Sequence, residues 1–219
     1  IYGLATADSY IKSGLANKIL FVGAEIQSTA LDKTTRGRDM AVIFGDGAGA
    51  CCIEGIETDQ RAGLLSTALH ADGNYAEALM TELPASKFPR RMIPGIDIDD
   101  ARYYPVMDGP AIFKKAVRQL PKVINESLQK AGIGLDEIDL IIPHQANMRI
   151  NQALGQFLKV DDDKVFHNIQ KYGNTTAASI PIALNEAIEE GRIGKSGDTV
   201  LFTGLGAGLT WGSIIYRFL

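Results

Sequence analysis

One pattern occurs twice in this sequence, near its start and near its end: a helix, a glycine, an apolar strand and a second glycine. The first copy comprises residues 7–14 followed by 19–23, and the second comprises residues 184–191 followed by 200–204. Glycine after the last helical turn is a common helix stop. A short apolar run that ends at glycine is typical of a buried strand. The repeat therefore predicts an α/β fold built from a duplicated unit.

Hydrophobic spacing outside the repeat indicates further elements. Apolar residues three and four apart predict a helix over residues 110–131, in which Pro121 should cause a kink or an interruption. Residues 71–106 contain several prolines, glycines and charged residues without periodicity, which indicates an irregular, partly exposed excursion. Shorter segments complete the prediction: helices over 5–14, 150–158 and 176–191, and strands over 18–24, 41–44, 50–53, 63–70, 200–203 and 213–218. The strands 41–44 and 50–53 are expected to flank a turn formed by the glycines between them.

Composition and cysteine content exclude several classes of protein. A formal net charge of −4 argues against a nucleic-acid-binding protein, and no apolar stretch reaches the roughly 18 residues of a membrane helix. Cys51 and Cys52 are adjacent and are the only cysteines, which argues against a disulfide framework and favours the cytoplasm. Because no paired His or Cys spacing typical of zinc is present, we expect no metal site.

Two short segments place a polar side chain where a predicted strand passes into a helix. His144 directly follows the apolar run 140–143, and Asn174 lies just before the helix predicted from residue 176. A strand end delivers such a side chain into a crevice, and the helix that follows holds it rigid. Each residue alone would be a cap or a structural residue. Together, a neutral imidazole and a carboxamide can stabilise one developing oxyanion, so the pair predicts carbonyl chemistry.

Glycines recur at alternate positions in residues 45–49 and 204–208, a spacing that is also found in dinucleotide-binding sites. A dinucleotide fingerprint must open a helix, whereas both segments here lead into predicted strands. We therefore expect these glycines to let the backbone approach a ligand or a neighbouring strand closely.

Four segments together resemble the β-ketoacyl-acyl carrier protein synthase III family of the thiolase superfamily, in the family's order and over nearly the whole chain. They are Phe-Gly-Asp-Gly-Ala-Gly-Ala (44–50), Pro-His-Gln-Ala-Asn-Met-Arg-Ile (143–150), Tyr-Gly-Asn-Thr-Thr-Ala-Ala (172–178) and Gly-Leu-Gly-Ala-Gly-Leu-Thr-Trp-Gly-Ser (204–213). The resemblance implies a thiolase-like α/β fold with mixed sheets. It divides the chain into residues 1–60, the remainder of an N-terminal half, and 61–219, the C-terminal half.

The resemblance also implies a nucleophilic cysteine at the start of the first helix of the repeat. In the second copy that helix begins near Thr175, sixteen residues before Gly191, and the same offset from Gly14 points just upstream of Ile1. We therefore expect the chain to match the C-terminal two-thirds of such a protein, with the N-terminal half incomplete. We also expect this chain alone to be inactive in condensation, because the cysteine would lie upstream.

The resemblance assigns roles to residues that match the family's motifs. His144 and Asn174 would be the catalytic pair that stabilises an enolate, whereas His70 and His167 match no motif and should be structural. The other assignments are the Ala207 backbone amide in an oxyanion hole, Arg38 on the coenzyme A nucleotide, Phe113 and Asn147 along the pantetheine tunnel, Leu205 at the acyl pocket, and Lys114 and Arg149 in a docking patch for the carrier protein.

These assignments imply an enzyme that starts fatty acid synthesis by condensing an acyl group, expected to be acetyl from acetyl-CoA, with malonyl-acyl carrier protein. It would be a homodimer and would need no metal or redox cofactor, since the coenzyme A thioester is its substrate. One alternative is a related condensing enzyme of secondary metabolism with a different starter. Another is a non-catalytic fragment that retains the binding tunnel. Independently of the function, the alternative for Arg38 and for the basic residues of helix 110–131 is that they are ordinary solvated charges.

Overall fold

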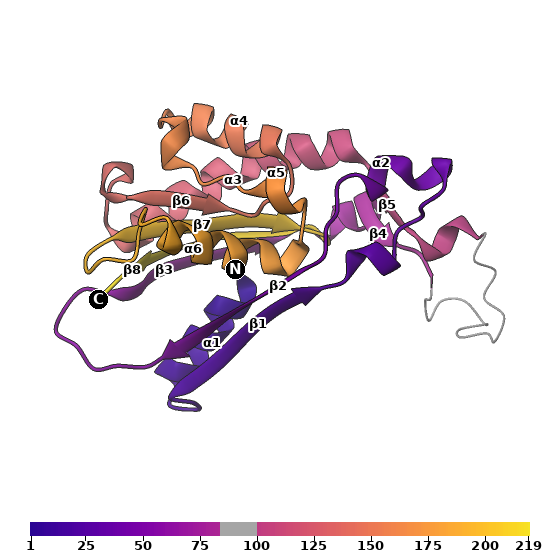
Figure 1. Cartoon of the computed structure of the whole chain (residues 1–219). Helices are drawn as coiled ribbons and strands as arrows, with labels where there is room; N and C mark the ends of the chain where they lie inside the picture. The colour runs from indigo at the N-terminus through magenta and orange to yellow at the C-terminus, as the bar shows by residue number, and fades with distance from the viewer. Residues whose placement is uncertain (84–99) are drawn as a thin grey trace.

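A computed structural model describes residues 1–83 and 100–219 of the chain (Figure 1). Its centre is a four-stranded sheet in the order β3-β8-β7-β6. Strands β6 and β7 are parallel, and the other neighbours are antiparallel, so the sheet is mixed as expected. The bounds of these strands are Gly63–Ala71 for β3, Leu140–Pro143 for β6, Thr199–Gly206 for β7 and Thr210–Arg217 for β8.

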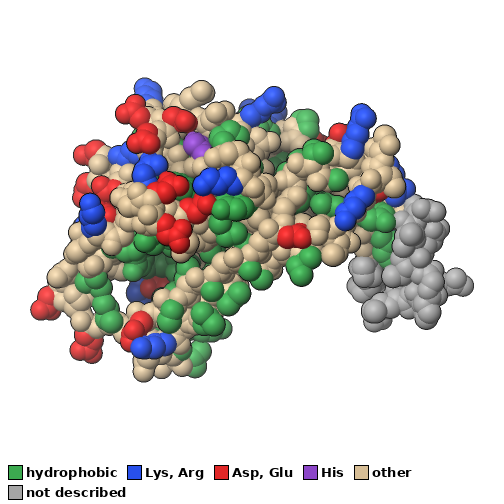
Figure 2. Space-filling view, in the orientation of Figure 1, with side chains coloured by type: hydrophobic (Ala, Val, Ile, Leu, Met, Phe, Trp, Pro, Cys, Tyr) green, Lys and Arg blue, Asp and Glu red, His purple; other side chains and the backbone are tan. Residues whose placement is uncertain are grey.

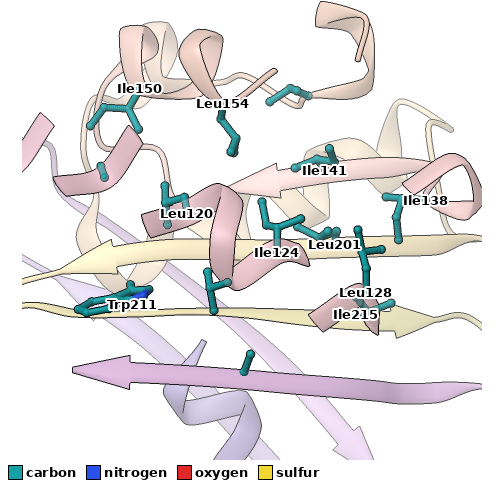
Figure 3. Close-up of a cluster of buried hydrophobic side chains, with 14 of the residues drawn as sticks. Leu120, Ile124, Leu128, Ile138, Ile141, Ile150, Leu154, Leu201, Trp211 and Ile215 are labelled. Atoms are coloured by element: carbon teal, nitrogen blue, oxygen red, sulfur yellow. The ribbon is translucent and has the colours of Figure 1, made fainter. Parts of the chain in front are cut away.

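Helices cover both faces of this sheet, because alternate residues of its strands are apolar on each side (Figure 1). Helices α3 (Gly109–Ala131) and α4 (Met148–Leu158) bury one face, and Figure 3 shows Leu120, Ile124 and Leu154 pointing at it. Helices α1 (Tyr2–Lys12) and α6 (Ser179–Glu189) pack on the other face. The helix–strand repeat is confirmed, because α1 precedes β1 and α6 precedes β7.

Helix α3 runs without a break from Gly109 to Ala131, so Pro121 does not interrupt it, and the kink that was the other expected outcome stays a prediction. The Asp108 side chain caps its start by accepting the Ala111 N–H at 3.0 Å, and Gly132 ends it in the left-handed conformation with φ of 61°. Leu120 and Ile124 are buried on either side of Pro121. We attribute the continuity to this packing, which outweighs the one hydrogen bond that proline removes.

A two-stranded antiparallel ribbon forms a further layer beyond α1 and α6. It consists of β1 (Lys18–Glu25) and β2 (Gly47–Glu54). Strand β1 was expected to be buried, but Leu20 and Val22 are 70% and 55% exposed, because no described element covers the outer face of the ribbon. That part of the prediction is therefore wrong, although the position of the strand is right.

The glycine segment 45–49 does not form the predicted turn between two strands. Residues 38–41 are a short helix, only Phe44 makes a bridge, and the glycines from Gly47 onward lie inside β2. The reason is close packing: a Cβ at Gly49 would lie 2.6 Å from Pro181 Cβ, and one at Gly23 would lie 2.5 Å from the Ala177 carbonyl oxygen. These glycines bring the ribbon against the start of α6.

The remaining elements are short. Within residues 71–106, described apart from 84–99, the expected excursion contains the strand pair β4–β5 and two 3-10 helices, and the rest of that prediction lies outside the described residues. The bounds are α2 Arg38–Ala41, α5 Ile169–Tyr172, β4 Leu79–Thr81 and β5 Pro105–Met107, with 3-10 helices at Gln27–Thr29, Thr35–Gly37, Gly73–Ala78, Ala101–Tyr103, Leu135–Glu137, Asp162–Lys164 and Thr176–Ala178.

Among the residues that the structure describes, no helix combines the length and the apolar character that crossing a membrane requires.

The packing of α4 gives a test of the core. Leu154 is 1% exposed and Phe157 on the same helix is 62% exposed. Leu154→Ala should lower the free energy of unfolding by about 2–5 kcal/mol, because it leaves a cavity in the main core. Phe157→Ala should change it by only about 0.5 kcal/mol, as expected for a surface site. Urea denaturation of both variants measures the difference, and equal losses would contradict the packing described.

Candidate active site

A cavity of about 1020 Å³ lies between the ribbon and the main sheet, and side chains from both halves of the repeat line it. Figure 2 shows the hollow between the ribbon and the body of the molecule, edged by hydrophobic side chains in green. Six of the residues assigned from the sequence are among its lining: Phe113, His144, Asn147, Asn174, Leu205 and Ala207. The structure therefore brings the expected polar and apolar groups into one space.

His144 lies at the carboxyl end of β6, where it contacts strand β7 and the start of α6. Its N–H donates to the Thr203 carbonyl at 2.7 Å, which continues the parallel pairing of β6 with β7. A Cβ at Gly204 would lie 3.0 Å from His144 Cβ, so glycine lets the imidazole pass over the neighbouring strand. Its Nδ1 lies 2.5 Å from the Ser179 hydroxyl at the start of α6.

The surroundings of His144 keep its ring neutral. Burial lowers the pKa of His144 from 6.5 to about 4. At neutral pH the ring therefore carries one proton, so one nitrogen donates and the other accepts. A neutral imidazole can donate a hydrogen bond from its protonated ring nitrogen to a developing oxyanion.

Asn174 is fixed by a short bridge to the segment before β2. Its N–H donates to the Ile43 carbonyl at 2.9 Å, and its carbonyl accepts the Gly45 N–H at 3.0 Å. The side-chain oxygen accepts the Thr176 N–H at 2.9 Å, an Asx-type turn. Because that partner can only donate, it fixes the orientation of the amide and leaves the Nδ2 group as the donor.

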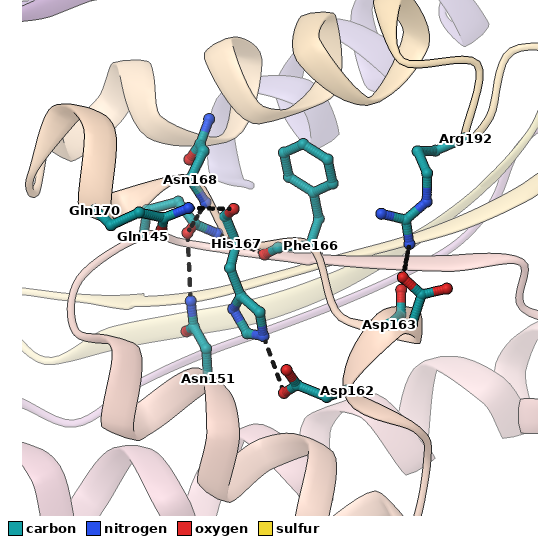
Figure 4. Close-up of polar contacts among 9 residues, drawn as sticks. All are labelled: Gln145, Asn151, Asp162, Asp163, Phe166, His167, Asn168, Gln170 and Arg192. Carbon is teal, nitrogen blue, oxygen red and sulfur yellow. Dashed lines mark hydrogen bonds and ion pairs between the residues drawn. The ribbon is translucent and has the colours of Figure 1, made fainter.

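A buried glutamine connects the His144 loop to the chain that leads to Asn174. Gln145 is 1% exposed and donates through Nε2 to the Pro143 carbonyl at 2.8 Å and to the Phe166 carbonyl at 3.1 Å. Its Oε1 accepts the Asn168 N–H at 3.1 Å, and Asn151 approaches the same oxygen (Figure 4). One side chain thus satisfies polar groups of three segments, and its loss would leave several unsatisfied.

A second network ties the stretch before Asn174 to α6. Glu186 accepts hydrogen bonds from Asn168 Nδ2 at 2.8 Å and from the Tyr172 hydroxyl at 2.5 Å, and Lys171 Nζ lies 3.3 Å away. Gly173, with φ of 69°, then turns the chain toward the ribbon. A Cβ there would lie 2.9 Å from the Ile43 carbonyl oxygen, so this turn needs glycine for its space and its φ.

The other assigned residues lie at different depths. Ala207 occupies the turn between β7 and β8, and Leu205 packs against the main core. Asn147 caps α4 by accepting the Arg149 N–H at 2.9 Å. Lys114 and Arg149 are exposed, each close in sequence to a residue of the cavity lining. Arg38 is exposed beside Asp39 and is not part of the lining.

Lys115, next to Lys114 on α3, is paired with an acidic side chain and is mostly buried. Lys115 Nζ lies 2.6 Å from Asp72 Oδ2 and is only 13% exposed. It also stacks over Tyr75, with Nζ 4.1 Å from the ring centre. Asp72 in turn exchanges two backbone hydrogen bonds with Leu209, so this ion pair supports the turn that carries Ala207.

The two cysteines lie on β2, on opposite faces of the strand. Cys52 is exposed, and burial raises the pKa of the half-buried Cys51 thiol. Gly47 lies against Thr175, and Cys51 is farther along the strand by about 13 Å at ~3.3 Å per residue. A reactive thiolate needs a lowered pKa, as at a helix N-terminus, and β2 offers none.

Two residues that support the pair, Gln145 and Ser179, were not assigned from the sequence. Gln145 lies within the family-like segment 143–150, but its partners Phe166 and Asn168 are distant in sequence. Ser179 is 35 positions from His144 and resembles any serine at a helix start. Only the tertiary structure shows what they contact.

Comparison with protein families matches residues 1–73 to 3-oxoacyl-[acyl-carrier-protein (ACP)] synthase III and residues 128–218 to the C-terminal part of the same family. The chain belongs to this family. The names 3-oxoacyl and β-ketoacyl denote the same chemical group. The resemblance to β-ketoacyl-acyl carrier protein synthase III that was inferred from the sequence is therefore confirmed.

Individual relatives agree with the family match. The chain is 44% identical over 218 residues to the β-ketoacyl-[acyl-carrier-protein] synthase III of Aquifex aeolicus, covering 100% of this chain and 63% of that protein. The structure of the Thermus thermophilus synthase III is 38% identical, with a TM-score of 0.88 over 100% of this chain and 64% of the other. A priming β-ketosynthase from the R1128 polyketide pathway is 26% identical, with a TM-score of 0.84 over 99% of this chain and 62% of the other.

The structural matches confirm the thiolase-like fold expected from the sequence. The chain spans less than two-thirds of the length of the curated relatives that it matches. Within residues 1–83 and 100–219, no group of three or more His, Cys, Asp or Glu side chains is arranged to hold a metal ion.

The protonation of His144 can be measured directly. We expect its ring to titrate near pH 4, well below the ordinary value of 6.5. Because the unfolded chain would bind the proton more readily, His144 should lower stability as the pH falls from about 6.5 toward 4. Nuclear magnetic resonance of ¹³C-labelled histidine gives the titration, with His144→Gln to assign the signal. A midpoint at 6.5 or above would contradict the described burial.

Proposed function

We propose that this chain carries the enolate-stabilising site of a β-ketoacyl-acyl carrier protein synthase III that starts fatty acid synthesis. One observation supports this most: His144 and Asn174 line the same cavity, and each has its second polar atom occupied by the protein. The arrangement leaves one N–H group of each side chain available to a ligand. Two such fixed donors suit an oxygen on which negative charge develops.

The proposed reaction begins with decarboxylation of a malonyl thioester. The bond from the α-carbon to the carboxylate breaks, carbon dioxide leaves, and the electron pair forms an enolate on the thioester oxygen. His144 and Asn174 donate hydrogen bonds to that oxygen. The enolate carbon then attacks an acyl group held as a thioester, a carbon–carbon bond forms, and the thiolate is released. The oxygen of the attacked carbonyl accepts the Ala207 backbone N–H.

We propose that neither Cys51 nor Cys52 is the acyl acceptor. Both belong to a strand, and the raised pKa of Cys51 disfavours the thiolate that must attack. This chain by itself would therefore not complete a condensation. Its own residues supply the stabilisation of the enolate and the walls of the substrate tunnel.

The substrates that we propose are an acyl-CoA, with acetyl-CoA as the starter, and malonyl-acyl carrier protein. Phe113, Asn147 and Leu205 line the cavity and would contact the pantetheine arm and the acyl group. Arg38, outside the lining, would reach the nucleotide. Lys114 and Arg149 would meet the acidic carrier protein at the rim. No metal or redox cofactor enters this chemistry.

The similarity to a priming β-ketosynthase of a polyketide pathway keeps a different starter as the second candidate. The higher identity to the synthases III of fatty acid synthesis favours the first. A binding fragment without activity is the remaining alternative. From the family resemblance we further propose a homodimer, and from the two unpaired cysteines a location in the cytoplasm.

Removal of either donor tests the proposed chemistry. His144→Ala and Asn174→Ala should each lower the rate of malonyl-CoA decarboxylation by on the order of 10²–10³, the usual cost of one oxyanion donor. The dissociation constant for malonyl-CoA should change by only a few-fold, because the donors act mainly on the transition state. Release of labelled carbon dioxide and calorimetry measure the two effects. Unchanged decarboxylation in both variants would contradict the assignment.

Charge reversal separates the two proposed binding regions. Arg149→Glu and Lys114→Glu should weaken binding of malonyl-carrier protein a few-fold, since an exposed ion pair contributes on the order of 0.2–1 kcal/mol, and should leave coenzyme A binding unchanged. Arg38→Glu should do the reverse.

Lys159→Glu, at the opposite end of α4 from Arg149, is the matched control and should affect neither ligand. Binding is measured at two salt concentrations, because the contribution of rim charges should decrease with ionic strength. If Arg149→Glu and Arg38→Glu affected both ligands alike, the separation into a docking patch and a nucleotide site would be wrong.

A further inference from the structure

Ser179 holds a position that the proposed chemistry does not yet explain. It is the first residue of α6 and is 2% exposed. Its hydroxyl oxygen lies 2.5 Å from His144 Nδ1 and 3.3 Å from the backbone nitrogen of Gln145. A buried hydroxyl between an imidazole and a backbone amide must distribute its single proton and its lone pairs in a definite way.

The allocation of protons follows from the partners. The Gln145 N–H can only donate, so the Ser179 oxygen accepts there. Among the residues that the structure describes, the Ser179 hydroxyl has one further partner within hydrogen-bond distance, His144 Nδ1. If the hydroxyl donates its proton to Nδ1, the neutral ring carries its own proton on Nε2.

We propose that Ser179 is the positioning residue that selects the Nε2–H form of His144, the form able to donate to an enolate oxygen. The effect of this tautomer on the reaction rests on the decarboxylation proposed above, whereas the contact between Ser179 and His144 does not depend on it. The opposite arrangement, in which Nδ1–H donates to the serine, would leave Nε2 as an acceptor. Such a ring would repel the developing negative charge.

The same short segment then orients both donors. Thr176 N–H occupies the Asn174 side-chain oxygen at 2.9 Å, and the Ser179 hydroxyl occupies His144 Nδ1. Ala178 is fully buried between them, so the two contacts belong to one packed turn. Orienting groups of this kind behind a functional imidazole are common, because they fix its tautomer and its angle.

The tautomer is observable without any activity measurement. In protein labelled with ¹⁵N-histidine, two-bond proton–nitrogen correlations distinguish the protonated from the unprotonated ring nitrogen. At pH 7 the wild-type protein should show His144 with the proton on Nε2. Ser179→Ala should lose this single form and show both tautomers, whereas Ser179→Thr, which keeps the hydroxyl, should retain it.

Ser127→Ala is the matched control, since Ser127 is fully buried and its hydroxyl donates to the Ser213 carbonyl at 3.1 Å, outside the cavity lining. It should leave the His144 spectrum unchanged. A wild-type ring protonated on Nδ1, or a Ser179→Ala ring that remains entirely in the Nε2–H form, would overturn the inference.

Activity gives an independent reading. Ser179→Ala should lower the decarboxylation rate about tenfold, less than the loss of the donor itself, and Ser179→Thr should restore most of it. The affinity for malonyl-CoA should not change. If wild-type protein fails to decarboxylate malonyl-CoA, the proposed function fails, but the tautomer measurement still decides the role of Ser179.

Discussion

The site depends first on the parallel pairing of β6 with β7. Pro143 lies opposite Thr203, and the His144 N–H extends the same ladder by one hydrogen bond. Parallel strands end at the same edge of a sheet, so this pairing places the histidine next to the glycines that follow Thr203. The core beneath it is formed by α3 and α4 on one face, as Figure 3 shows, and by α6 on the other, and it supports this edge. Without that register, the imidazole would not meet the residues described above.

Close packing through glycine is the second requirement. Asn174 reaches the cavity because its segment bridges to Ile43 and Gly45, while Gly23 and Gly49 let the ribbon approach the start of α6. A side chain at any of these glycines would meet backbone or ring atoms at 2.9 Å or less. Both donors belong to residues 61–219, and Asn174 lies where this part of the chain contacts Ile43 and Gly45 of the first part. Gln145 joins the loop of His144 to the segment that leads to Asn174, as Figure 4 shows, and Glu186 ties that segment to α6.

The elements that depend on local sequence pattern could be predicted from the sequence. The repeat, the long helix and the strands at the chain's end follow from hydrophobic spacing and glycine chemistry. Prediction failed where tertiary contacts decide. The glycines after Gly45 indicated a turn, but they sit inside a strand because α6 packs on them. The strand at residues 18–24 has an apolar sequence, yet one face is exposed. Ser179 could not be found, since its partner His144 is 35 positions away and is set by the fold and not by spacing.

The central claim is that His144 and Asn174 together bind the oxygen on which enolate charge develops. A crystal structure with a non-cleavable malonyl-CoA analogue tests this most directly. The account predicts that the oxygen corresponding to the thioester carbonyl lies about 2.7–3.1 Å from both His144 Nε2 and Asn174 Nδ2. A well-ordered analogue whose carbonyl oxygen contacts neither nitrogen would contradict it.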